Sequence, residues 1–238
     1  MTTVDQVQPA VFRCVVITIF PDSLNMLIDA GITGRAHDQG LWQLFTLNPR
    51  DYAVGKHRRV DDRPYGGGPG MVMQAPPLRK SIQAAYKLLQ NPNAPVIYMS
   101  PQGERFSQTM ATSFIAEPGS DYIVLCGRYE GVDERLLEKY VDREISIGDY
   151  VLSGGEIPAM AILDAIVRLI PGACGHQQSV VEDSFVTNTL DHAQYTRPEI
   201  FEGQSVPSVL LSGDHKAIKA WRQNNEVERT KSRRPDLI

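Results

Sequence analysis

Four segments of this sequence are unusually rich in glycine and polar residues, and three of them follow stretches that read as buried strands. In an open α/β sheet, ligands bind beyond the carboxyl ends of the strands. Glycine at that edge lets backbone N–H and C=O groups approach a ligand closely. Together these loops predict one small-molecule site, although each loop alone could be an ordinary tight turn. The segments are RPYGGGPGM at 63–71, SPQG at 100–103, GRYEG at 127–131 and SIGDYVLSGGE at 146–156.

Several familiar catalytic and nucleotide-binding motifs are missing from the sequence. It contains no GxxxxGK[ST], no GxGxxG between a strand and a helix, and no HExxH, GxSxG or EF-hand loop. The sequence therefore lacks the metal-binding or Lys-Ser/Thr motif that an enzyme acting on phosphate esters would need. The histidines show no metal-ligand spacing, so we interpret each as a surface or capping residue and predict no metal site. They are His37, His57, His176, His192 and His215.

Short apolar runs alternate with helical patterns up to residue 170. This alternation is typical of an α/β domain with a largely parallel sheet. We expect strands over 14–19, 42–47, 96–99, 122–126 and 145–147. We expect helices over 21–29, from Pro76, from Ser107 to about 116, from Asp133 to about 140, and over 157–170.

The pattern changes after Pro171-Gly172, where a polar stretch has no sustained period. Helical segments are expected to start at Pro198, Pro207 and Asp214, the last ending near Gln223. We therefore predict a flexible tail over 1–10, an α/β domain over 11–172, a flexible linker over 173–188 and a small all-α domain over 189–238.

Composition places the chain among ordinary globular proteins. Of its 238 residues 42% are hydrophobic and 22% are charged, which argues against intrinsic disorder. The three cysteines lie far apart and form no CxxC, so we do not expect a disulfide framework. We expect instead a protein of a reducing, cytoplasmic compartment. No stretch reaches the roughly 18 apolar residues of a membrane span.

Charge is spread unevenly along the chain. Residues 216–238 hold seven Lys or Arg against three acids, and 50–63 hold five against three. Residues 117–183 hold thirteen acids against five bases. The two basic stretches could bind a polyanion or form solvated faces, and charge alone leaves both interpretations open.

Seven motifs in fixed order give the chain a resemblance to a known family. All four glycine-rich segments, SPQG among them, recur in it, with the third extended to CGRYEGVDER at 126–135. RLIPG at 168–172, EDSF at 182–185 and HxxYTRPE at 192–199 complete the set. Over about residues 14–238 the sequence resembles bacterial tRNA (guanine-N1)-methyltransferases of the SPOUT superfamily.

The resemblance implies properties that spacing could not show. It implies that the C-terminal part of the α/β domain is threaded into a trefoil knot, and that two copies form a homodimer with composite active sites. The implied reaction moves a methyl group from S-adenosylmethionine to N1 of guanosine 37, 3′ of the anticodon in tRNA, and so maintains the reading frame. The implied small C-terminal domain binds the tRNA, and Mg²⁺ is implied as a requirement for activity.

The resemblance also implies roles for individual residues. Asp183 corresponds to the general base, Arg168 to the partner of guanine O6, and Ser184 is placed to orient the base. Without the resemblance, Asp183 would read as a solvated acid, and Arg168 as half of a helical ion pair with Asp164. The implied cofactor pocket comprises Tyr98, Ser100, Gly127, Glu130, Ile147, Gly148, Asp149, Tyr150, Val151, Leu152 and Gly154.

The residue types agree with a pocket for a cationic, partly aromatic ligand. Ile147, Val151 and Leu152 would offer apolar contacts, and Glu130 would complement a sulfonium or ammonium group. Glu130 also reads as an acid at a helix N-terminus. A non-catalytic tRNA- or nucleotide-binding module with the same pocket is the alternative function. Because Arg168, Asp183 and the intact GDYVLSGGE loop are all present, the sequence favours the enzyme.

Overall fold

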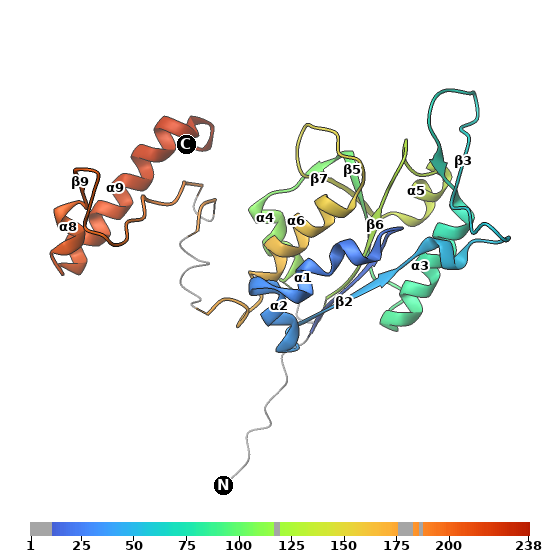
Figure 1. Cartoon of the computed structure of the whole chain (residues 1–238), viewed down its shortest axis with the longest axis horizontal. Coiled ribbons are helices and arrows are strands. Elements are labelled where there is room, and N and C mark those ends of the chain that lie inside the picture. The colour runs from blue at the N-terminus through green and yellow to red at the C-terminus, as the bar shows by residue number, and fades with distance from the viewer. Residues whose placement is uncertain (1–10, 117–119, 176–182, 186–187) are drawn as a thin grey trace, which may run out of the picture. The chain divides into compact units, whose positions relative to one another are not determined.

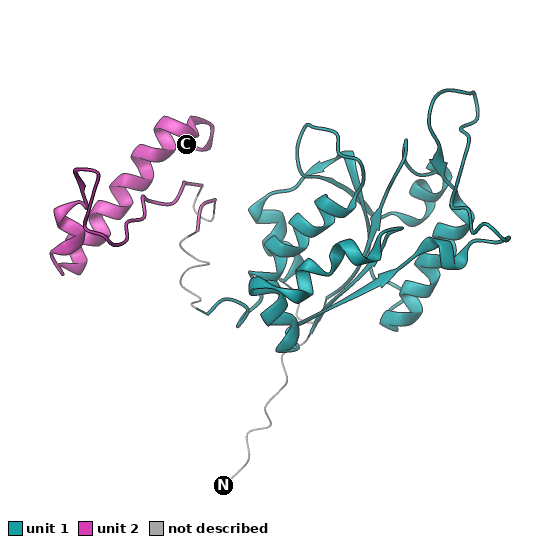
Figure 2. Cartoon of the chain, in the orientation of Figure 1, with its two compact units in different colours: residues 1–175 teal, residues 176–238 magenta. Residues whose placement is uncertain are grey.

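The computed structural model describes residues 11–116, 120–175, 183–185 and 188–238, which divide between two compact units, 1–175 and 176–238 (Figure 2). The predicted tail, 1–10, and most of the predicted linker, 173–188, lie outside the described residues.

The first unit is built on a five-stranded sheet in which every neighbouring pair of strands is parallel (Figure 1). The strand order is β2-β1-β6-β5-β7. This confirms the prediction of an α/β fold with a largely parallel sheet. The strands are β1 (Phe12–Ile17), β2 (Trp42–Leu47), β5 (Val96–Arg105), β6 (Asp121–Cys126) and β7 (Arg143–Ser146), beside a two-stranded pair, β3 (Asp61–Asp62) and β4 (Val72–Met73).

Alternation along β1 shows how the sheet is buried on both faces. Cys14 and Val16 belong to one hydrophobic cluster, whereas Val15 and Ile17 belong to the other. Successive side chains of a strand point to opposite faces, so β1 is apolar on both faces from Cys14 to Ile17. Helices α1 (Met26–Asp29), α2 (Gly31–Asp38), α4 (Gln108–Phe114) and α6 (Glu156–Val167) contribute to the first cluster, and α3 (Ala75–Leu89) and α5 (Glu134–Tyr140) to the second.

Two helix starts follow directly from the sequence. The Ser107 hydroxyl accepts a hydrogen bond from Met110 N at 3.2 Å, and Asp133 Oδ1 accepts one from Arg135 N at 3.1 Å. Each side chain satisfies a backbone donor that the first helical turn leaves unpaired. Both residues therefore cap the helices that the sequence predicts there.

The predicted helix over 21–29 is not continuous. The 3-10 helix η1 (Pro21–Leu24) gives way to α1, and Ala30 is extended before α2 begins. Gly31 adopts φ +72°, a conformation that glycine reaches without strain. α2 is missing from the sequence-based prediction because its apolar pattern is short. A second 3-10 helix, η2 (Pro49–Tyr52), follows β2.

The second unit contains α8 (Ser208–Leu211), α9 (His215–Arg233), the 3-10 helix η3 (Pro235–Leu237) and a hairpin of β8 (Ile200–Phe201) and β9 (Gln204–Ser205). The hairpin corrects two expectations: the helical segment from Pro198 and a C-terminal domain made only of helices. Glu202 and Gly203 both have positive φ, which suits a two-residue hairpin turn. α9 also runs ten residues beyond its predicted end, from Gln223 to Arg233. None of the helices that the structure describes has the length and apolar character required to cross a bilayer.

Candidate active site

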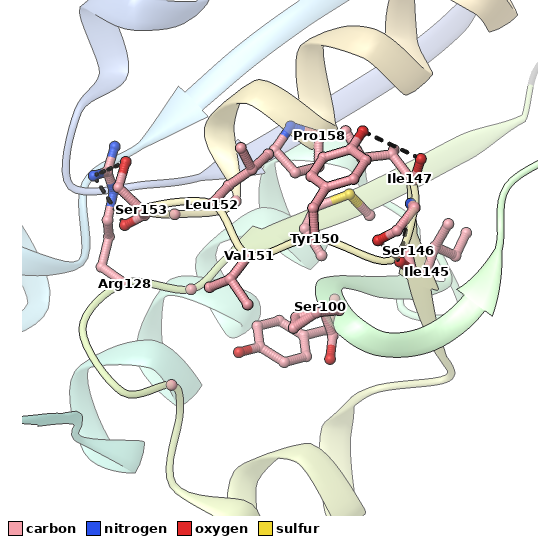
Figure 3. A pocket seen from close by; sticks show the side chains of 18 of the residues that line it. Ser100, Arg128, Ile145, Ser146, Ile147, Tyr150, Val151, Leu152, Ser153 and Pro158 are labelled. Carbon is pink, nitrogen blue, oxygen red and sulfur yellow. Dashed lines mark hydrogen bonds between the residues drawn. The ribbon is translucent and has the colours of Figure 1, made fainter.

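A cavity of about 210 Å³ lies at the ends of β6 and β7 and beside the middle of β5, where the pairing of β5 with β7 shifts register between Met99 and Glu104 (Figure 3). The segment SPQG, expected to follow a strand over 96–99, is therefore part of β5 itself. Three of the glycine-rich segments meet there, because the carboxyl ends of parallel strands share one edge of the sheet. Ser100 and Pro101 come from the segment 100–103. The segment 127–131 contributes all of its residues, and the segment 146–156 contributes most of its own.

The structure brings together ten of the eleven residues that the resemblance assigns to the cofactor. Asp149 is the exception: it is exposed and does not line the cavity. The ten lining residues are Tyr98, Ser100, Gly127, Glu130, Ile147, Gly148, Tyr150, Val151, Leu152 and Gly154.

Hydrogen bonds within the loop over 146–156 stabilise its conformation. The Ser146 hydroxyl donates to Gly148 O at 3.1 Å and accepts from Gly148 N at 3.2 Å. Gly148 adopts φ +151°, and Tyr150 donates its hydroxyl to Ile147 O at 3.3 Å. Val151 is 86% exposed, so the loop offers an uncovered apolar side chain to the cavity. Such a surface suits a flat apolar group of a ligand.

Gly127 permits a close approach that no other residue would allow. A Cβ atom placed there would lie 2.6 Å from the Tyr98 hydroxyl and 2.8 Å from Cε2 of its ring. Tyr98 itself is buried, and burial together with Glu144 and Glu134 raises its pKa to about 12. Its phenol therefore stays neutral at physiological pH and forms a fixed wall of the cavity.

Glu130 contributes an acid to the cavity and is held by the fourth glycine-rich segment. Glu130 N donates to Met71 O at 2.9 Å, and its side chain lies directly over Gly70. Gly70 has φ +82°. The RPYGGGPGM loop at 63–71 thus reaches the cavity indirectly, by supporting Glu130.

A buried ion pair beneath the cavity joins two of the loops. Glu156 is 2% exposed and accepts from Arg128 Nε at 2.9 Å and from the Thr18 hydroxyl at 2.6 Å. Arg128 also donates to Ser153 O at 3.1 Å, and Gly155 N donates to Gly127 O at 2.9 Å. Sequence reasoning singled out neither Arg128 nor Glu156, although both lie within the quoted motifs.

The three residues assigned to catalysis divide between the units. Arg168 follows the last turn of α6 and is half-buried, outside the set of residues that line the cavity. Asp183 and Ser184 belong to the second unit. Ala173, placed in the linker by the prediction, is instead 1% exposed and packs in the core of the first unit.

The turn that carries Asp183 is fixed within the second unit. Ser184 Oγ accepts from Asp191 N at 2.9 Å, and Phe185 N donates to Thr189 O at 2.8 Å. The Arg234 guanidinium lies 5.8 Å from the centroid of the Phe185 ring. Asp183 therefore has a defined position relative to the end of α9.

Comparison with known proteins gives one consistent result. A family model described as tRNA (Guanine-1)-methyltransferase TrmD matches residues 12–238. The tRNA (guanine-N(1)-)-methyltransferase of Halorhodospira halophila is 54% identical over 226 residues, covering 95% of this chain and 84% of the relative. Proteins of the same name from Alcanivorax borkumensis and Psychromonas ingrahamii are each 53% identical; the matches cover 95% and 94% of this chain, and 85% and 90% of the relatives.

Proposed function

The chain belongs to the tRNA (guanine-1)-methyltransferase family, and we propose that it methylates N1 of guanosine 37, 3′ of the anticodon in tRNA, with S-adenosylmethionine as donor. The observation that supports this proposal most strongly is the cavity that three family motifs form beside β5 and at the ends of β6 and β7. Its substrate and cofactor place the reaction in the cytoplasm.

The cavity suits S-adenosylmethionine in the chemistry of its lining. Val151 and Leu152 offer apolar contacts for the adenine, and backbone groups of 147–154 are available to read its edge. Glu130 supplies a negative charge for the cationic end of the cofactor. Bound S-adenosylmethionine supplies the methyl group, and the side chains of the protein hold the reactants and move the proton.

Guanine N1 carries a proton at neutral pH, so a base must remove it as the methyl group arrives. We assign this role to Asp183. Negative charge then develops on O6, where the Arg168 guanidinium would stabilise it. Ser184 holds the turn through its bond to Asp191 N, and so positions Asp183.

The division of these residues between units favours a site shared by two copies of the chain. Asp183 lies on the second unit and the cavity on the first, so nothing obliges one chain to supply both. A two-fold dimer needs one self-complementary surface. The outer face of α6 is the candidate, since Ile157 is 53% exposed and Ala161 and Asp164 are exposed beside it, next to Met160.

The path of the chain after β7 supports a trefoil knot. β5 lies between β6 and β7 in the sheet, yet the segment leaving β7 reaches the end of β6. There Gly154 bridges with Arg128, and Gly155 N donates to Gly127 O. The segment must therefore cross the end of β5, and we propose that it threads the preceding loop.

The Mg²⁺ ion implied by the family does not fit the side chains that line the cavity. Mg²⁺ prefers several oxygen ligands in octahedral geometry. Glu130 is the one carboxylate among the described residues that line the cavity. In the proposed mechanism Asp183 takes the proton and Arg168 stabilises the charge on O6, and neither step is assigned to a metal ion.

Substitution of Gly127 by alanine is expected to weaken S-adenosylmethionine binding at least about tenfold, because the new methyl group must displace the buried Tyr98 ring. Calorimetry on the protein without tRNA measures this change. Gly175→Ala is the matched control, since a Cβ atom there would meet nothing within 4 Å. Equal affinities in the two variants would place the cofactor elsewhere.

The basic face of α9 is expected to carry much of the tRNA affinity through phosphate contacts. Lys231 and Arg233 are exposed near its end. Reversing both charges with Lys231→Glu and Arg233→Glu should reduce the salt dependence of tRNA binding by about one unit of slope or more. Lys87→Glu with Lys139→Glu, on helices of the first unit, should leave the slope unchanged. An unaltered slope in the α9 variant would make this face a solvated surface.

The direct test of the function uses tRNA transcripts that carry either G or A after the anticodon. Labelled S-adenosylmethionine should transfer its methyl group only to the transcript with G, and digestion should yield N1-methylguanosine. Tight binding of both ligands without any incorporation would favour the non-catalytic binding module.

A further inference from the structure

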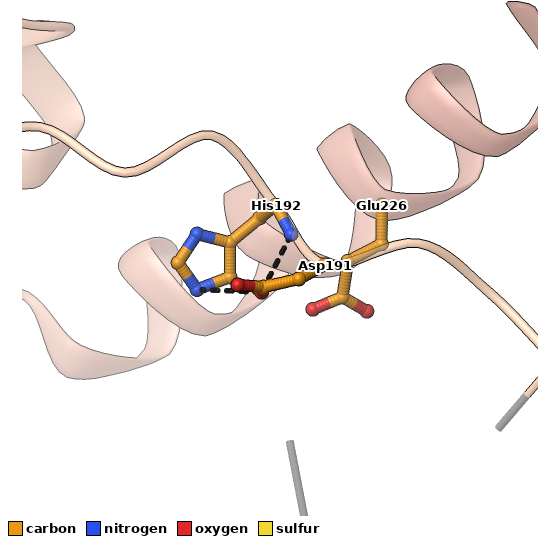
Figure 4. Close-up of side chains that lie close together, drawn as sticks. All are labelled: Asp191, His192 and Glu226. Carbon is orange, nitrogen blue, oxygen red and sulfur yellow. Dashed lines mark hydrogen bonds and ion pairs between the residues drawn. The ribbon is translucent and has the colours of Figure 1, made fainter. Parts of the chain in front are cut away.

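A compact group of three side chains in the second unit lies outside the proposed chemistry. One ligand atom each from Asp191, His192 and Glu226 lies within 4.8 Å of the others (Figure 4). Asp191 and His192 precede the hairpin, whereas Glu226 comes from α9. The expectation that His192 is a surface or capping residue is wrong, because its side chain is only 8% exposed.

The contacts of His192 fix which ring nitrogen can accept a ligand. Its Nδ1 lies 3.1 Å from the carbonyl oxygen of Ala193, and a carbonyl can only accept a hydrogen bond. Nδ1 therefore carries a proton, and in the neutral ring the lone pair lies on Nε2. Nε2 lies 3.7 Å from Asp191 Oδ1, beyond hydrogen-bond distance, on the side of the carboxylates. A histidine that binds a metal ion usually donates its other N–H to a carbonyl or carboxylate in this way.

The two carboxylates retain capacity to accept a cation. Asp191 Oδ1 accepts from His192 N at 2.7 Å, and Oδ2 accepts from Gln194 Nε2 at 3.1 Å, each leaving further lone pairs. The half-buried Glu226 carboxylate has no hydrogen bond to any residue that the structure describes. Two negative charges therefore face a buried imidazole.

Backbone contacts hold this group in place against α9. Leu190 N donates to the Thr230 hydroxyl at 2.9 Å, and Ala193 N donates to Asn225 Oδ1 at 2.8 Å. Arg229 Nε donates to Asp191 O at 3.1 Å. The segment from Leu190 to Ala193 is thus fixed at both ends before any ligand binds.

We propose that Asp191, His192 and Glu226 bind a divalent transition-metal ion of the Zn²⁺ class, with water completing its coordination. An imidazole with two carboxylates is a ligand set that Zn²⁺ accepts. Mg²⁺ is disfavoured, because it requires oxygen ligands. The ion would join the segment before the hairpin to α9. The competing occupant is a proton, which would make His192 an imidazolium between the two acids.

Calorimetric titration of metal-free full-length protein with Zn²⁺ tests this site. Glu226→Gln keeps the shape of the side chain and removes its charge, and should weaken the tightest Zn²⁺ binding more than about tenfold. Glu228→Gln is the matched control, since Glu228 is exposed on the same helix two residues away and faces elsewhere. Mg²⁺ in excess should not displace the Zn²⁺.

A fluorescence measurement tests whether the bound metal ion lies at Asp191, His192 and Glu226. The His192 ring lies 6.4 Å from the ring of Trp221, so paramagnetic Co²⁺ bound there should quench Trp221 fluorescence. Quenching should disappear in Glu226→Gln and persist in Glu228→Gln. Absence of Zn²⁺ binding, or equal binding and quenching in the two variants, would overturn the proposal and leave the proton as the occupant.

Discussion

Replacement of Asp183 by asparagine is expected to slow methyl transfer by about 10²-fold or more, the contribution typical of a general base. Asparagine keeps the shape of the side chain but cannot take the proton of guanine N1. The bonds of Ser184 Oγ with Asp191 N and of Phe185 N with Thr189 O, which hold the turn, are both retained in this variant. Single-turnover kinetics with saturating tRNA and S-adenosylmethionine measure the methyl-transfer step itself.

Two controls separate loss of a base from loss of structure. Asp214→Asn makes the same substitution in the second unit at the cap of α9, where asparagine caps equally well. It should retain normal turnover. Cofactor affinity of Asp183→Asn should equal that of the unaltered protein, because Asp183 is not among the residues that line the cavity. Near-normal turnover in Asp183→Asn would remove the residue from the mechanism.

Replacement of Glu156 by alanine is expected to lower the free energy of unfolding of the first unit by about 1–3 kcal/mol, the usual effect of leaving buried hydrogen-bond donors without their acceptor. Glu156 is 2% exposed, and its loss leaves Arg128 and Thr18 without their acceptor. Urea denaturation followed by the fluorescence of the buried Trp42, in a Trp221→Phe background, reports this unit alone.

Glu104→Ala provides the matched comparison for that substitution. Glu104 pairs with Arg143 at 2.8 Å, but both side chains are largely exposed, so its removal should cost less than about 1 kcal/mol. The Glu156 variant should also lose cofactor affinity, since Arg128 no longer anchors Ser153 O. Equal stability of the two variants would show that the Arg128 pair does not hold the cavity together.

The sheet and the cavity were predictable because local patterns determine both. β6 holds a short apolar run after Asp121, and parallel strands bring the loops after β6 and β7 to one edge of the sheet. Nothing in the sequence excludes Asp149 from the residues that line the cavity, because its neighbours on both sides do line it. Its exclusion depends on the backbone conformation of the loop at Gly148.

Other features depend on contacts between distant residues. Arg128 and Glu156 are 28 positions apart, and nothing local marks either as buried. α9 extends past Gln223 because Asn225 and Thr230 bond the segment before the hairpin, although both residue types are weak helix formers. His192 is buried for the same reason: α9 and its neighbours cover it, and no period in the sequence indicates that packing.

We propose that the cavity of one chain and the Asp183 of another together form one methyl-transfer site. Mixed dimers of Asp183→Asn chains with Gly127→Val chains test it most directly, because each parent homodimer should be nearly inactive. A shared site predicts that mixing restores activity, since one of the two sites in each heterodimer combines an intact cavity with an intact Asp183. If both groups come from the same chain, no heterodimer contains a complete site, and a mixture that stays inactive would contradict the claim.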